Sequence, residues 1–196
     1  MTLGPTASER RARARADLRM GVPVILRLGG TQALAVAAET LSRARLAELL
    51  RLGAPVLAIT ARRAATLNAR AYDTDLARLS LPSDVSLDWI QAVANPADDL
   101  SNPMKGPFHS ERGGTCDLHR AAIVLAKEAR LLPSALILPL DDIADAKAEI
   151  FQSMGPEDVA VIPADLPQTG RLASLAREAG VGRGGRGSGG GGGCSP

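Results

Sequence analysis

The residue types best suited to metal chemistry lie close together in the middle of the chain. Cys116 and His119 have the Cys-x-x-His spacing of one zinc half-site, Asp117 lies between them, and His109 precedes them. A structural zinc site needs four ligands, but no second pair follows, and Cys194 lies in a glycine-rich tail. The pattern therefore favours a surface or partly buried His119 near the start of a helix, with Asp117 as its cap, over a metal site.

The segment Arg27–Gln32, RLGGTQ, joins two apolar runs. Divalent cations such as Mg²⁺ prefer carboxylate oxygens, and proton transfer on a sugar phosphate needs a base, but this segment contains no carboxylate. Gly29 and Gly30 could form a phosphate-binding loop, yet such loops normally open a helix, whereas a strand is expected to follow here. The segment is therefore predicted to be a plain hairpin turn.

His109, Ser110 and Glu111 are the residue types of a hydrolase, but they are consecutive in the sequence. A nucleophile, its base and the group that orients the base meet through folding and not through adjacency. These residues therefore predict a solvated loop.

Arginine is concentrated near both ends of the chain, although the net charge is small. With 23 Lys+Arg against 21 Asp+Glu, the formal charge of +2 is too small for nucleic-acid binding by bulk electrostatics. Arg183 and Arg186 lie in an Arg/Gly-rich segment of the type that binds RNA loosely, which leaves weak RNA binding as the least favoured function. Near the N-terminus a solvated helix face is the simpler interpretation of Arg10, Arg11, Arg13, Arg15 and Arg19.

Strands and helices alternate along the chain, which is typical of an α/β domain with a mixed sheet flanked by helices. Ser8 is expected to cap the first helix, and Leu118, Ala122, Leu125 and Ala129 recur at the spacing of a core-facing helix. Strands are expected over 22–26, 33–38, 55–60, 134–140 and 159–162. Helices are expected over 8–20, 42–53, 61–67, 84–94, 117–132, 141–151 and 172–179.

One domain over 1–179 and a disordered Gly-rich tail over 180–196 are expected. About 180 residues suffice for a self-sufficient core, whereas the tail, with 10 of the 20 glycines, can bury nothing. The two cysteines make no disulfide framework, and no apolar run approaches the roughly 20 residues of a membrane span. The sequence therefore predicts a cytoplasmic protein with no membrane partner.

Two groups of segments carry a resemblance to a known family. The first comprises ADLRMGVPVIL, ALAVAAE, LAELLRLG and PVLAITARRAATL, and the second NPADDLSNP and GGTCDLHRAAIVLAKEARLLPSALI. Over about 16–140 they resemble dihydroxybutanone phosphate synthase of riboflavin biosynthesis. The segments DLRMGVPVIL and LAKEARLLPSAL are still more similar to the N-terminal region of GTP cyclohydrolase II in some bacteria, which looks like a decayed synthase domain. The resemblance implies a synthase-like fold.

The resemblance also implies which functional residues are missing. Glu39 matches the Ala-Ala-Glu step of the synthase family. Arg27–Gln32 stands in place of the acidic metal-binding loop. Leu118, His119 and Arg120 stand at the family's His-Thr-Glu, so both functional side chains are replaced.

The cyclohydrolase chemistry is missing by the same comparison. Its zinc step needs three cysteine thiolates that hold the metal and its water. The fragment PFHSE at 107–111 is similar to the segment before the first zinc cysteine, but Arg112 occupies the cysteine's place. We therefore expect no catalytic, cofactor-binding or metal-binding residues in this chain.

The sequence thus predicts a catalytically silent domain with a structural or regulatory role in riboflavin synthesis. Two partners are expected as alternatives, a second copy of the chain or a riboflavin-pathway cyclohydrolase domain. The other functional hypothesis is an active enzyme on ribulose 5-phosphate, with a rebuilt Mg²⁺ site of Glu39, Asp117 and His119. That site requires Glu39 within roughly 10 Å of His119, because coordination distances are near 2 Å.

Overall fold

The computed structural model describes residues 5–28, 30–140 and 162–163. The predicted helices over 141–151 and 172–179 and the predicted tail over 180–196 lie outside these residues. Of the strand predicted over 159–162, only its last residue is described.

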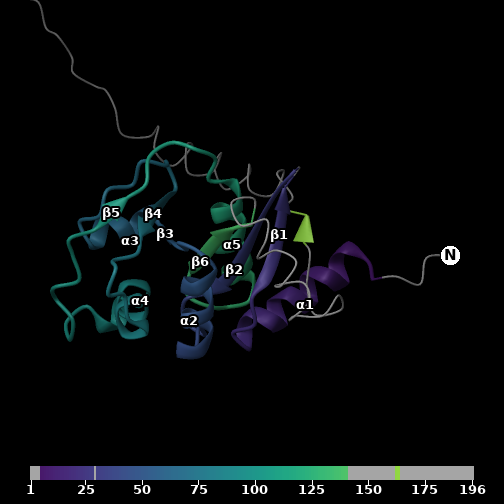
Figure 1. Cartoon of the computed structure of the whole chain (residues 1–196), viewed down its shortest axis with the longest axis horizontal. Helices are drawn as coiled ribbons and strands as arrows, with labels where there is room; N and C mark the ends of the chain where they lie inside the picture. The colour runs from purple at the N-terminus through teal and green to yellow at the C-terminus, as the bar shows by residue number, and fades with distance from the viewer. Residues whose placement is uncertain (1–4, 29, 141–161, 164–196) are drawn as a thin grey trace, which may run out of the picture.

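Within the described residues, seven strands form one sheet in the order β5-β4-β3-β6-β2-β1-β7 (Figure 1). Only β1 and β7 pair in parallel, and every other neighbouring pair is antiparallel. The predicted mixed sheet is therefore confirmed. The strands are β1 (Val24–Leu28), β2 (Thr31–Ala37), β3 (Val56–Thr60), β4 (Leu76–Ser80), β5 (His109–Ser110), β6 (Ser134–Pro139) and β7 (Ile162–Pro163).

Helices cover both faces of the sheet, which gives three layers with a core on each side. Helices α1 (Ala7–Arg19) and α5 (Asp117–Glu128) bury Leu18 and Leu125 against one face. Helices α2 (Arg43–Leu52), α3 (Ala61–Thr66) and α4 (Leu87–Ala94) contribute to the core on the opposite face. A short 3₁₀ helix, η1 (Pro96–Asp98), follows α4. The predicted α/β class, with helices flanking the sheet, is thus confirmed.

Capping side chains fix where the helices begin. Ser42 caps α2 as its position predicts, because its Oγ accepts a hydrogen bond from the Arg45 amide. The predicted cap of α1 is wrong, since Thr6 and not Ser8 is the N-cap. Thr6 and Glu9 form a reciprocal capping box, which satisfies two backbone amides where Ser8 would satisfy one.

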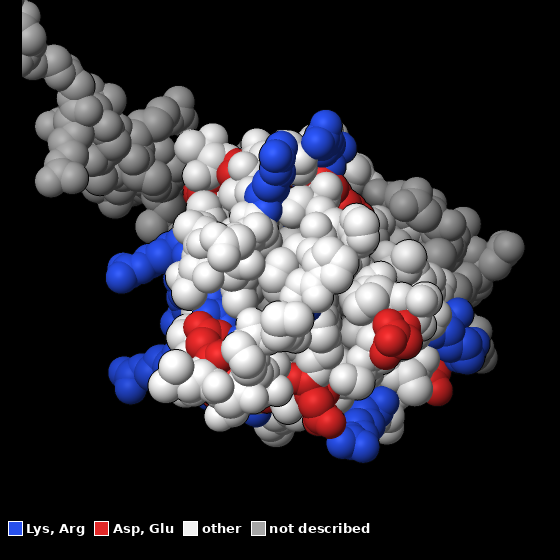
Figure 2. Space-filling model, turned by 90° about the vertical axis from the view of Figure 1, so that its left-hand side faces the viewer, with Lys and Arg blue, Asp and Glu red and all other residues white. Residues whose placement is uncertain are grey.

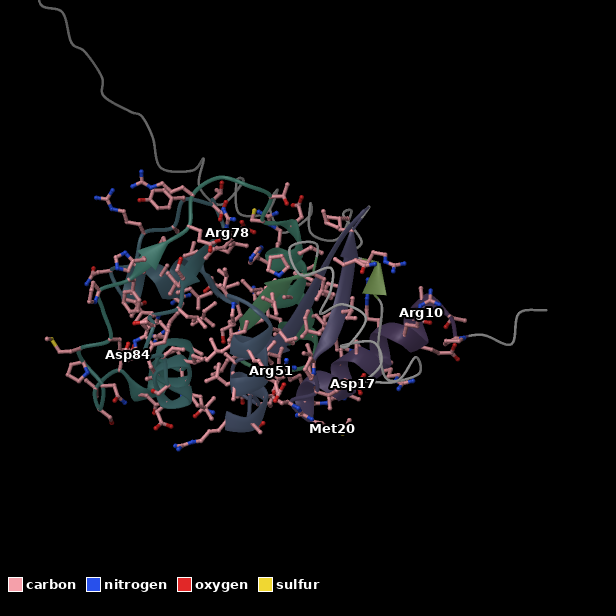
Figure 3. All side chains as sticks on the ribbon, viewed as in Figure 1. Arg10, Asp17, Met20, Arg51, Arg78 and Asp84 are labelled. Atoms are coloured by element: carbon pink, nitrogen blue, oxygen red, sulfur yellow. The ribbon has the colours of Figure 1, made fainter. Side chains whose placement is uncertain are left out.

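The segment 68–114 contains two strands in addition to its predicted helix. Strand β4 was obscured in the sequence by Arg78, a charged residue inside an otherwise apolar run. Arg78 is only 4% exposed, and it lies between β4 and α5 (Figure 3). The strand lies between β5 and β3 in the sheet, and its buried charged side chain must be paired.

Candidate functional site

The N-terminal end of α5 brings together the polar residues that could do chemistry. Arg120 donates to both carboxylate oxygens of Asp75, at 2.6 and 2.8 Å, and to Asp117 at 2.8 Å. Asp75 immediately precedes β4, so this bidentate pair ties the start of α5 to the sheet. The arginine and both carboxylates are thus already paired with one another.

A second ion pair lies beside the first. Arg78 donates from Nε to Asp73 at 2.8 Å and from Nη2 to the carbonyl oxygen of Gly113 at 2.6 Å. Its Nη1 lies 3.9 Å from a carboxylate oxygen of Glu111. Arg78 thus holds the loop before α5 against β4.

His119 lies between these ion pairs and is 7% exposed. Among the described residues neither of its ring nitrogens has a hydrogen-bond partner. Burial lowers the pKa of His119 to about 4, and the positive charge of Arg78 adds to this effect against the opposing charge of Asp73. The prediction of a surface or partly buried histidine is therefore wrong, because the side chain is buried and its imidazole is neutral at pH 7.

Cys116, the cysteine of the possible zinc half-site, makes a different interaction. Cys116 is half-buried, and its Sγ accepts a hydrogen bond from Arg120 at 3.2 Å. Burial raises the pKa of this thiol, which disfavours the thiolate that zinc requires. In the described part of the chain no three His, Cys, Asp or Glu side chains are placed to hold a metal.

Asp117 does not cap α5, so that prediction is also wrong. The N-cap residue is Cys116, which makes no side-chain capping bond. Asp117 lies in the first turn and accepts from Arg120 instead. The guanidinium three residues later is a charged donor, and it gives the carboxylate a stronger partner than a backbone amide would.

Glu39 lies at the other end of α5. Its Oε2 accepts a hydrogen bond from the amide of Leu132, beyond the C-terminal end of the helix, at 2.6 Å. The helix from His119 to Glu128 rises by about 14 Å. The structure therefore does not bring Glu39 to Asp117 and His119, and these residues do not fit a shared Mg²⁺.

The other sequence candidates lie on the sheet. Arg27 and Gln32 pair across the β1–β2 hairpin, and Thr31 donates to the carbonyl oxygen of Leu28 at 2.8 Å, which confirms the predicted turn. His109 and Ser110 form the short edge strand β5, so the predicted solvated loop is wrong at these two residues. Neighbouring strand residues point to opposite faces, which keeps this serine and histidine from forming a nucleophile and base pair.

Sequence reasoning missed Asp73, Asp75 and Arg78, which supply most of the charge at this site. They belong to the segment DTDLARLS, where two carboxylates precede a strand that contains a single arginine. A charged residue within an alternating apolar segment is the one signal that could have identified them, because a buried charge requires a partner.

The chain is similar to a curated protein of riboflavin biosynthesis. It is 34% identical over 140 residues to GTP cyclohydrolase-2 of Azospirillum brasilense, a match that covers 70% of this chain and 36% of that protein. The chain thus spans about a third of the length of this curated relative. No protein-family model matches the chain. The predicted resemblance to GTP cyclohydrolase II is confirmed.

Comparison with solved structures shows the fold. The chain aligns with 3,4-dihydroxy-2-butanone 4-phosphate synthase of Candida albicans with a TM-score of 0.50 and 16% identity, over 84% of this chain and 95% of that one. A two-domain synthase of the same name from A. baumannii aligns with a TM-score of 0.47 and 19% identity, over 66% of this chain and 47% of that one. The first likeness confirms the synthase-like fold predicted from the sequence.

Proposed function

We propose that this chain is a catalytically silent, synthase-like domain with a structural or regulatory role in riboflavin biosynthesis. The observation that carries the proposal is the pairing of Arg120, which stands where the resembled family has a glutamate. A carboxylate at that position could bind a divalent cation or take a proton, whereas a paired guanidinium can do neither.

The electrostatics of the site support the same proposal. Hydrogen bonds to Asp75 raise the pKa of Arg120 above its already high ordinary value, so the side chain stays cationic. His119, the nearest candidate base, is buried and lacks a polar partner among the described residues. A general base must reach the proton that it removes, and a buried imidazole near the Arg78 guanidinium cannot.

The partner of such a domain is part of the proposal. The curated relative is named GTP cyclohydrolase-2 and is much longer than the matched region. We therefore propose that the domain binds a cyclohydrolase domain, or a second copy of itself, in the cytoplasm. In the described residues no helix is long and apolar enough to cross a membrane.

Turnover assays test the catalytic part of the proposal. The purified chain is incubated with ribulose 5-phosphate and Mg²⁺, and separately with GTP and Zn²⁺, with the synthase of Candida albicans as the positive control for the first reaction. We expect product formation no faster than in buffer. Turnover of either substrate that is proportional to protein concentration would refute catalytic silence.

Sedimentation tests the structural part. The chain is run alone and mixed with a separately produced GTP cyclohydrolase catalytic domain. We expect either self-association or a mixed complex at micromolar concentration. If the chain sediments as a monomer in both samples, the proposed assembly role is wrong, and this result is independent of the turnover assay.

Two alternatives are less well supported. An active sugar-phosphate enzyme would use Glu39 together with His119, but these side chains lie at opposite ends of α5. The Arg/Gly-rich segment that could bind RNA lies outside the described residues. RNA binding by the tail stays a prediction, and deletion of residues 181–196 with a filter-binding measurement tests it.

A further inference from the structure

A cleft of about 780 Å³ opens beside β5, on the side of the sheet away from α5. One wall is the end of α3 and the loop that follows, and the other is the loop that leads into β5. Leu67 and Phe108 line the cleft and also pack against the core beneath α2 and α4, whereas α5 covers the opposite face. The volume is that of a small-molecule site, and the cleft is separate from the N-terminal end of α5.

Two guanidinium groups converge on one phenol at this cleft. Arg112 does not line the cleft itself, but it contacts a residue that does: it donates to the hydroxyl of Tyr72 at 2.5 Å and stacks over its ring, 4.4 Å from the centroid. Arg70, which lines the cleft with Tyr72, adds a second positive charge near the same hydroxyl. Within the described residues neither guanidinium has a carboxylate partner. Two like charges at one neutral oxygen form a site that a multivalent anion would stabilise.

The nearby arginines also change the pKa of Tyr72. Partial desolvation would raise the pKa of Tyr72, yet the hydrogen bond from Arg112 and the positive charges of Arg112 and Arg70 lower it. The phenol oxygen is therefore held in a positive potential.

The opposite wall carries one cation, Lys105, and one carboxylate, Asp99, which also pairs with Arg63 of α3. Arg63 and Lys105, 8% and 7% exposed, both donate to the single carboxylate of Asp99. Asp98, the other carboxylate of this segment, does not line the cleft and bonds to the amide of Asn95. One acid thus neutralises two buried cations.

Polar and apolar groups are available for the rest of a ligand. Ser110 lines the cleft, and within the described part of the chain its buried Oγ has no hydrogen-bond partner. Met104 lines the cleft with 92% of its surface exposed, and Phe108 adds an aromatic surface. In Figure 2, which looks at the side of the molecule that carries β5, α3 and α4, Lys and Arg side chains project around the edges of a mostly uncharged face, interspersed with Asp and Glu.

We propose that this cleft binds a mononucleotide-sized phosphate ester, with Arg70 and Arg112 paired to its phosphate and Met104 and Phe108 against its apolar part. Arginine suits this task because its planar fork matches two phosphate oxygens at once. The proposal goes beyond the assembly role proposed above and does not depend on it.

Calorimetric titration with GMP as the probe tests the proposal. Guanosine is the uncharged control, and inorganic phosphate is the competitor. The variants Arg70→Gln and Arg112→Gln change exposed residues, so they should fold. Arg43→Gln, which removes one exposed arginine from α2, is the control matched in charge. Each cleft variant is expected to weaken GMP binding roughly tenfold or more, as the loss of a charge-assisted hydrogen bond implies.

The outcomes separate a built site from general attraction of an anion to a basic surface. Binding of GMP but not guanosine, displaced by phosphate and weakened by both cleft variants, supports the proposal. Equal binding of GMP and guanosine, or an Arg43→Gln effect as large as the cleft variants show, overturns it. So does the absence of GMP binding up to about ten millimolar, well beyond the weak end of ordinary ligand affinities. None of these measurements involves turnover or assembly.

Discussion

Lowering the pH from 7 to 5 is expected to destabilise the folded chain through His119. The imidazole has an ordinary pKa of 6.5 and a folded-state pKa of about 4, because burial and Arg78 disfavour its charged form. Below pH 6.5 the unfolded chain therefore binds a proton that the folded chain excludes. Stability falls as the pH drops through this window, and the loss levels off only below the folded pKa.

The size of the loss follows from the difference between the two pKa values. Each pKa unit corresponds to 1.36 kcal/mol, so His119 is expected to lower the free energy of unfolding by about 2 kcal/mol at pH 5 and by about 3 kcal/mol near pH 4. Carboxylates contribute little above pH 5. Asp75, for example, has a pKa held below its ordinary 3.8 by hydrogen bonds from Arg120, so its contribution is lost only at lower pH.

Urea denaturation at pH 7, 6 and 5 measures this effect, with Trp89, the only tryptophan, as the fluorescence probe. The variant His119→Met removes the titrating group and fills a similar volume. At pH 7 this variant should be at least as stable as the wild type, because it removes two buried nitrogens that lack partners in the described residues. At pH 5 it should be more stable than the wild type by about 2 kcal/mol.

The variant His109→Gln is the matched control, since its side chain is exposed on β5. It should retain the full pH dependence of the wild type. If His119→Met loses as much stability between pH 7 and 5 as the wild type does, the buried imidazole is not the cause and the reasoning fails.

Three substitutions test the ion pairs and the backbone. Arg63→Met should cost about 3–5 kcal/mol in urea denaturation at pH 7, because it leaves three backbone carbonyls without this donor and Asp99 with Lys105 alone. Arg62→Met, at an exposed position, should cost little. Equal effects would contradict the assigned role. Arg120→Glu places a third carboxylate beside two others and should destabilise by at least about 3 kcal/mol without creating synthase turnover, so a stable or active variant would be unexpected. Gly21→Ala should cost about 1–3 kcal/mol of stability, because Gly21 has φ +71° and the new Cβ would lie 2.2 Å from a carbonyl oxygen. Gly30→Ala, whose Cβ meets nothing within 4 Å, should cost under about 0.5 kcal/mol. A thermal melt that ranks the two variants otherwise would refute the backbone argument.

The elements with local signals could be predicted from the sequence. The hairpin around Gly30, the cap at Ser42 and the apolar spacing of α5 each depend on a few neighbouring residues. The N-cap at Thr6 could have been predicted by the same means, because Thr-x-x-Glu is a capping-box sequence. Its misassignment was an error of interpretation and not a limit of the sequence.

The site could not be predicted in the same way because its contacts are distant in sequence. Arg120 and Asp75 are 45 positions apart, and Arg78 and Gly113 are 35 apart. The sequence near His119 contains no sign of its burial. Only the tertiary pairing of β4 and α5 shows that the histidine is enclosed.

The pairing at the start of α5 explains how a synthase-like fold can persist without the family's site residues. Removing a metal-binding glutamate alone would leave neighbouring buried charges without a partner. Each such charge costs several kcal/mol, so the fold needs replacement pairs. Here Arg120 pairs with two carboxylates, and Arg78 pairs with a third while fixing the adjacent loop. The same side chains that exclude a cation from this position therefore hold α5 against the sheet.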